Sequence, residues 1–257
     1  MQVTNLAYFY ETARKVRGGK FVWWKDGNGE ARDNVLLGGT ILNPNKGLGH
    51  LWAAQLVEYR LGGGCLIFRS FKTKTDTAAN ATTVVIDADG FSDAPEVGMY
   101  VMVAPDSLEV ETTEYETTES SGTYTTTATT TKADYTGTYA KITAVVYDAA
   151  NEKFTLTLEN KLSSSKIDAG TILVEADAAS DVALDNPTGV CEVLVPNPNT
   201  FVEADRDLLP TQGYGIENAN YSISTVFNKK AFLARMQPLP KYVLDKNRSH
   251  IDGVFWI

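Results

Sequence analysis

Short runs of β-type residues separated by turn residues constrain the fold of this chain more than any other feature. The clearest pair covers residues 139–146 and 153–158, which flank the turn-rich segment 147–152. Apolar residues recur at every second position of both runs: Ile142, Ala144 and Val146, then Phe154, Leu156 and Leu158. A period of two is typical of a strand with one buried face, so these runs predict a hairpin.

Similar runs predict further strands at 65–68, 82–86, 99–104, 171–175 and 221–227, with a last one at Phe232-Leu233. Residues 51–60 fit a short amphipathic helix or a strand, and their pattern does not separate the two. The glycine-rich stretch 38–45 reads as a loop. Short strands at this spacing predict an all-β chain built as a small antiparallel β-barrel or sandwich.

The chain has 257 residues, enough for one large domain or two small ones. We expect an extended arm with irregular loops over residues 1–50. A β-barrel or sandwich domain is expected over 51–180, with an insertion at 106–137. Residues 181–257 are expected to form a C-terminal β segment and a tail, which packs on the core or on neighbouring subunits.

The insertion is rich in threonine and acidic residues. Residues 106–131 contain no Lys or Arg and six acids, and threonine supplies eleven of the twenty residues 112–131. Apolar residues are too sparse here to build a core, and threonine favours strands. We expect a long acidic hairpin or loop that projects from the barrel, with Glu111, Glu114, Glu116 and Tyr124 as its candidate contact residues.

Both ends of the chain combine basic and aromatic residues, and we take them as a candidate interface with a partner. The candidate residues are Arg14, Lys15, Arg17, Phe21, Trp23, Trp24, Lys25, Val254, Phe255, Trp256 and Ile257. The N-terminal aromatics either bury themselves on another molecule or form an irregular first layer of the chain's own core. The basic ends would suit an acidic scaffold, although ordinary solvated faces explain the charge alone more simply.

Composition argues against most catalytic chemistry. The chain has only two histidines, His50 and His250, and no cofactor-binding fingerprint, calcium loop or nucleophile motif is complete. We expect no catalytic, cofactor-binding or metal site, although a glycosidase with two carboxylates remains an alternative. Cys65 and Cys191 are expected to be buried reduced thiols. The net charge of −9 argues against nucleic acid as a partner.

The N-terminus lacks the pattern of a signal peptide, and no apolar stretch approaches the roughly 18–20 residues that span a bilayer. We therefore expect synthesis in a cytoplasm, no export by the general route and no membrane partner.

The chain contains the segments LVEYRLG at 56–62, VVIDADGFSDAPEVGM at 84–99, GTILVEA at 170–176, MQPLP at 236–240 and NRS at 247–249. Together these segments resemble head-associated structural proteins of tailed bacteriophages, a group of auxiliary capsid, cement and head-fibre proteins. The resemblance implies a β-rich, non-enzymatic module on the outer surface of a phage head, with the major capsid protein as its partner. It names other copies of the chain and head-fibre proteins as further candidate partners, and it implies synthesis in the bacterial host cytoplasm and a final location in the virion. The alternative is a head-fibre or adhesion module that anchors a fibre or binds host surface glycans.

Overall fold

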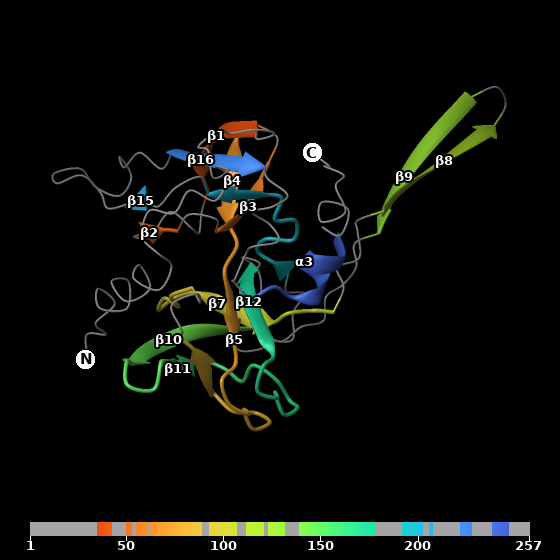
Figure 1. The fold of residues 1–257 in the computed structure, drawn as a ribbon. Coiled ribbons are helices and arrows are strands. Elements are labelled where there is room, and N and C mark those ends of the chain that lie inside the picture. The colour runs from red at the N-terminus through yellow and green to blue at the C-terminus, as the bar shows by residue number, and fades with distance from the viewer. Residues whose placement is uncertain are drawn as a thin grey trace.

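The structure is a computed structural model that describes residues 35–42, 50–52, 55–60, 62–88, 93–106, 112–120, 123–131, 139–177, 192–202, 206–207, 222–227 and 238–246. Strands dominate these residues, and their only helix is the short α3 (Lys241–Lys246). The predicted all-β class is therefore confirmed. The residues fall into two larger sheets and two small two-stranded ones (Figure 1).

The first sheet is a closed barrel of five strands: β1 (Val35–Ile41), β16 (Ser222–Phe227), β14 (Thr200–Val202), β3 (Leu56–Tyr59) and β4 (Gly64–Ile67). Neighbouring strands are antiparallel except at the closure, where β1 and β4 run parallel. The ambiguous segment 51–60 resolves into strands, since β2 (His50–Leu51) and β3 lie within it or at its edge.

The loop predicted over 38–45 is wrong at its start, because residues 38–41 belong to β1. Gly39 shows the physical reason. A Cβ atom at this position would lie 2.4 Å from the Cys65 Sγ and 2.8 Å from the Gly63 carbonyl oxygen. The glycine therefore serves the close approach of β1 and β4 and does not mark a loop.

The second sheet has the order β13–β12–β7–β10–β11–β6, with β5 beside β12. Its strands are β5 (Ser70–Lys72), β6 (Thr83–Asp87), β7 (Tyr100–Val103), β10 (Tyr139–Asp148), β11 (Lys153–Leu158), β12 (Ile172–Asp177) and β13 (Glu192–Val193). An antiparallel bridge between Thr73, just after β5, and Ile86 of β6 brings the two ends of the sheet together. The sheet thus curls around a core of its own.

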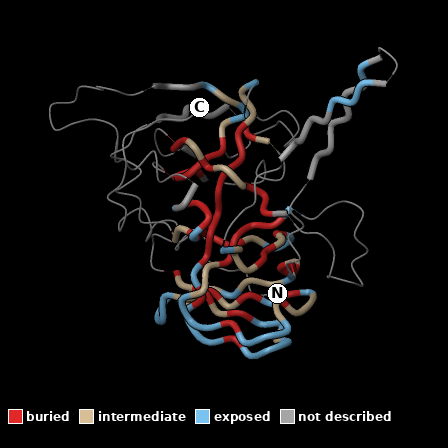
Figure 2. The backbone as a smooth tube through the Cα atoms, turned by 90° about the vertical axis from the view of Figure 1, so that its right-hand side faces the viewer, coloured by how far each residue is buried: buried red, intermediate tan, exposed pale blue. Residues whose placement is uncertain are grey.

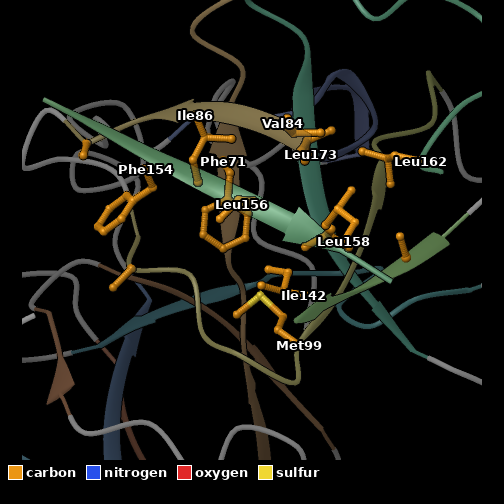
Figure 3. Packing of buried hydrophobic residues seen from close by; sticks show 14 of the residues in the cluster. Phe71, Val84, Ile86, Met99, Ile142, Phe154, Leu156, Leu158, Leu162 and Leu173 are labelled. Carbon is orange, nitrogen blue, oxygen red and sulfur yellow. The ribbon is translucent and has the colours of Figure 1, made fainter. Parts of the chain in front are cut away.

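That core confirms the predicted hairpin and corrects one strand of it. Phe154 and Leu156 of β11 point inward beside Phe71 (Figure 3) and are fully buried. In β10 the pairing register shifts between Ile142 and Ala144. Such a bulge moves the following residues to the opposite face. Val146, predicted to point inward, is therefore 44% exposed.

A second apolar cluster joins the barrel to the second sheet. It contains Leu56 and Phe201 from the barrel strands, Met102 and Val174 from the second sheet, and Tyr242 from α3. Buried backbone consequently runs without interruption from one sheet to the other (Figure 2). The barrel also draws strands from each of the three predicted segments 1–50, 51–180 and 181–257.

Candidate functional site

The acidic, threonine-rich insertion forms a hairpin of two nine-residue strands, β8 (Thr112–Ser120) and β9 (Thr123–Thr131). The register runs from Thr112 opposite Thr131 to Ser120 opposite Thr123 without a shift. The hairpin stands away from the two large sheets (Figure 1), and in the described part of the chain its strands pair only with each other. The projecting hairpin predicted from the sequence is therefore confirmed.

The two strands of this hairpin differ sharply in charge. β8 carries three glutamates, Glu114, Glu116 and Glu119, whereas β9 has the sequence TYTTTATTT and carries no charge. In the register, Glu114 lies opposite Thr129, Glu116 opposite Thr127 and Glu119 opposite Tyr124. All the charge of the paired region therefore lies along one edge, and the other edge is neutral.

Tyr124 lies near the tip of the hairpin, directly opposite Glu119. Tyr124 is 70% exposed, the highest value among the large hydrophobic residues whose burial the structure describes. Glu119 is exposed as well. The tip thus combines an aromatic ring with a carboxylate, a pair that can contact a partner of mixed polarity.

The predicted interface residues of the two chain ends lie outside the described residues. This applies to the basic and aromatic group of residues 14–25 and to the apolar group of residues 254–257. Glu111 also lies outside them. Of the candidate residues, the structure places Glu114, Glu116 and Tyr124, all on the hairpin.

A buried ion pair lies where the barrel meets the second sheet. Arg69 follows β4 and precedes β5, and its guanidinium binds the Glu175 carboxylate of β12 through two hydrogen bonds of 2.8 and 2.6 Å. The two side chains are 4% and 3% exposed. Nη1 of Arg69 is buried, lies 3.4 Å from Glu96 Oε2 and forms no hydrogen bond with any described residue.

The polar cluster extends from Arg69 toward the barrel through Asp93. One oxygen of the Asp93 carboxylate accepts a hydrogen bond from the Gln55 side chain, and the other accepts one from the Ser70 backbone, both at 3.2 Å. Gln55 directly precedes β3, and Ser70 begins β5. The Asp93 carboxylate therefore links the barrel to the second sheet.

Charges within this cluster shift each other's ionisation. Burial alone would lower the pKa of Arg69, but the nearby charge of Glu175, with those of Glu96 and Asp93, raises it. The guanidinium therefore stays charged. Burial raises the pKa of Glu96, and the attraction of Arg69 offsets only part of that effect. Three carboxylates therefore surround one cation at the junction, and burying these charges costs free energy that only close pairing offsets.

Cys65 is buried inside the barrel, as predicted, and is a free thiol. Burial raises its pKa to about 11, although a hydrogen bond with the Thr40 backbone opposes the shift. The thiolate is the reactive form of cysteine, so the thiol is inert at neutral pH. Cys191 lies outside the described residues.

Within the described ranges, no group of three or more His, Cys, Asp and Glu side chains is placed to hold a metal ion. The same ranges contain no helix with the length and apolar character that crossing a membrane requires.

Sequence reasoning missed the Arg69 cluster, although a signal for it exists. Arg69 stands in the apolar run from Cys65 to Phe71, and Glu175 is the one acid before Asp177 in β12. A lone charge inside a buried strand pattern needs a partner of opposite charge. The sequence does not show which of the many acids supplies it.

Comparison with known proteins adds no family: no protein-family model and no curated protein matches the chain. The hairpin, the two-sheet body and the resemblance described above are therefore what points to a function.

Proposed function

We propose that this chain is a non-enzymatic auxiliary capsid protein that binds the outer surface of a phage head and reinforces contacts between capsid subunits. The observation that carries the proposal is the acidic hairpin β8–β9, which projects from a well-packed two-sheet body. Such a shape suits a protein that sits on a surface and reaches away from its own footprint. The resemblance to head-associated phage proteins points in the same direction.

The body has the properties of a rigid platform. Closure of the barrel removes its sheet edges, which limits unwanted strand pairing. The cluster that joins barrel and second sheet, together with the buried Arg69–Glu175 pair, opposes relative movement of the two halves. A rigid body can hold a projecting element at a fixed angle to a capsid surface.

The hairpin has the properties of a contact element. A two-stranded ribbon is only marginally stable in water without further strands or a packing surface. A nine-pair ribbon whose strands pair with no other described strand is therefore suited to gain stability from an external contact. In this proposal the basic and aromatic chain ends grip the major capsid protein, and the hairpin points outward or bridges to another copy.

The test is binding to heads assembled from the major capsid protein of the same phage. We expect the purified chain to co-sediment with heads and to saturate at a fixed ratio to the capsid subunit. Removal of residues 1–25 or 254–257 should abolish binding, while circular dichroism shows an unchanged β spectrum. Removal of residues 112–131 is the matched control and should leave head binding intact.

Two outcomes contradict this proposal separately. A full-length chain that never saturates the heads rules out the capsid function. Saturable binding that survives both terminal truncations rules out the chain ends as the gripping elements.

Tyr124 favours a second candidate, a head-fibre or adhesion module that binds host surface glycans. Tyr124 is 70% exposed and offers an apolar ring face, and the Glu119 carboxylate opposite it can accept hydrogen bonds from hydroxyl groups. A glycan array probed with the full chain and with Tyr124→Ala distinguishes the two functions. Binding that Tyr124→Ala abolishes supports the adhesion module, and the absence of any array signal rejects it.

A further inference from the structure

We infer that the neutral edge of the hairpin pairs with the same edge of a second copy of this chain. The two hairpins would form one four-stranded antiparallel sheet in the order β8–β9–β9′–β8′, where the prime marks the second copy. This inference does not depend on the capsid proposal, because it concerns the purified chain alone in solution.

The first step is that β9 offers an available edge. Among the described residues β9 pairs only with β8, and the hairpin stands away from both large sheets. The outer backbone groups of such a strand are a template for another strand. At nine residues β9 is longer than most strands, so the template is extensive.

The second step is that β9 lacks the features that protect edge strands from pairing. Proteins usually protect such edges with charged residues, proline or a bulge. β9 consists of seven threonines, one tyrosine and one alanine, and its register with β8 has no bulge. β8 is protected by Glu114, Glu116 and Glu119. The available edge is therefore β9.

The third step is that charge selects the arrangement. With β9 against β9′, the two acidic strands lie three strand spacings apart, about 14 Å. That separation exceeds the screening length of about 8 Å at physiological salt, so their repulsion is weak. Direct pairing of β8 with β8′ would bring the glutamates to about 5 Å. Pairing of β9 with β8′ would place the glutamates of the two copies at an intermediate distance. The same head-to-tail contact would then repeat from copy to copy and form an open filament.

The threonine pattern also suits pairing of β9 with itself. Thr127 is the middle residue of β9, and every second residue from Thr123 to Thr131 is a threonine. In an antiparallel pair centred on Thr127, each of these residues lies opposite another threonine. Cross-strand threonine pairs stabilise sheets, so the symmetric arrangement repeats a favourable contact along the strand.

The experiment compares two lysine substitutions at one cross-strand pair. Thr117 of β8 lies directly opposite Thr126 of β9, so Thr126→Lys and Thr117→Lys change the charge equally on the same face of the hairpin. Only Thr126→Lys places a charge on the proposed interface. Sedimentation equilibrium over a concentration series measures the monomer–dimer dissociation constant of each protein.

We expect the full-length chain to form dimers and no larger species. Thr126→Lys should raise the dissociation constant by about tenfold or more, because charged residues on an edge strand oppose pairing. Thr117→Lys should leave it within about threefold, because exposed charge changes far from an interface have small effects. Higher salt should not weaken the dimer. Circular dichroism of both variants checks that the β body remains folded.

Hydrogen exchange gives an independent measurement on the unmodified chain. Raising the protein concentration should slow exchange of β9 amides and leave β8 amides unchanged. A chain that stays monomeric, a Thr117→Lys effect as large as that of Thr126→Lys, or growth into filaments would each overturn the inference.

Discussion

Arg69 lies between a strand of the barrel and a strand of the second sheet and forms an ion pair at their junction. Its position between β4 and β5 places the guanidinium at the junction, where Glu175, Glu96 and Asp93 face it or lie nearby. Removing an arginine and a glutamate from water is costly, and only good hydrogen-bond geometry offsets that cost. The paired hydrogen bonds of 2.8 and 2.6 Å provide such geometry.

We expect Arg69→Met to destabilise the protein strongly, because it leaves the Glu175 carboxylate buried without its cation. Loss of one partner of a buried pair costs about 3–5 kcal/mol, to be measured as the change in free energy of unfolding in urea. The double variant Arg69→Met/Glu175→Leu should recover most of that loss. Lys166→Met is the control, since its ion pairs with Asp76 and Asp168 are solvent-exposed and should contribute too little to measure. Equal effects of Arg69→Met and Lys166→Met would contradict this prediction.

The raised pKa of Cys65 predicts how the free energy of unfolding changes in alkaline solution. Its pKa is about 11 in the folded protein and about 9.0 when exposed, so the unfolded thiol loses its proton first as the pH rises. Between these values the unfolded state binds fewer protons, and the stability that the buried thiol contributes is therefore lost. Cys65→Ala should reduce this alkaline loss of unfolding free energy. An identical pH profile above pH 9 in both proteins would show that Cys65 is not responsible.

At the scale of elements, the sequence predicted strands well where the alternation is continuous and poorly where local geometry breaks it. β11 alternates without interruption, and its apolar residues are buried as expected. β10 carries a bulge that no residue type marks, so Val146 was assigned to the wrong face. Gly39 signals a loop in sequence, yet a neighbouring strand requires it. Register and close approach depend on partners distant in the chain, which local patterns do not contain.

The hairpin was predictable because its composition excludes a core, but its asymmetric charge became meaningful only with the register. At protein concentrations where the full-length chain is monomeric, we expect replacement of residues 112–131 by a short Gly-Ser linker to leave the free energy of unfolding unchanged. The reason is that no described strand of either large sheet pairs with β8 or β9. Urea denaturation of both proteins provides the measurement. A clear loss of stability on deletion would show that the hairpin supports the body.

At the scale of the whole molecule, the barrel and the second sheet share an apolar cluster and a buried ion pair, so they should unfold together. Native-state hydrogen exchange should give the same opening free energy for amides of β3 in the barrel and of β11 in the second sheet. Arg69→Met should make the opening free energies of the β3 and β11 amides differ. Two distinct transitions in the unmodified protein would contradict this coupling.

The closure of the barrel has a consequence for the order of events during synthesis. Strand β16 (Ser222–Phe227) lies between β1 and β14, so the ring cannot close until translation has passed residue 227. The second sheet is complete once residue 193 has been made, apart from its contacts with the barrel. Roughly 190 residues separate the start of β1 from the end of β16. At about 5–20 residues per second, strand β1 therefore waits about 10–40 seconds before its partner β16 exists.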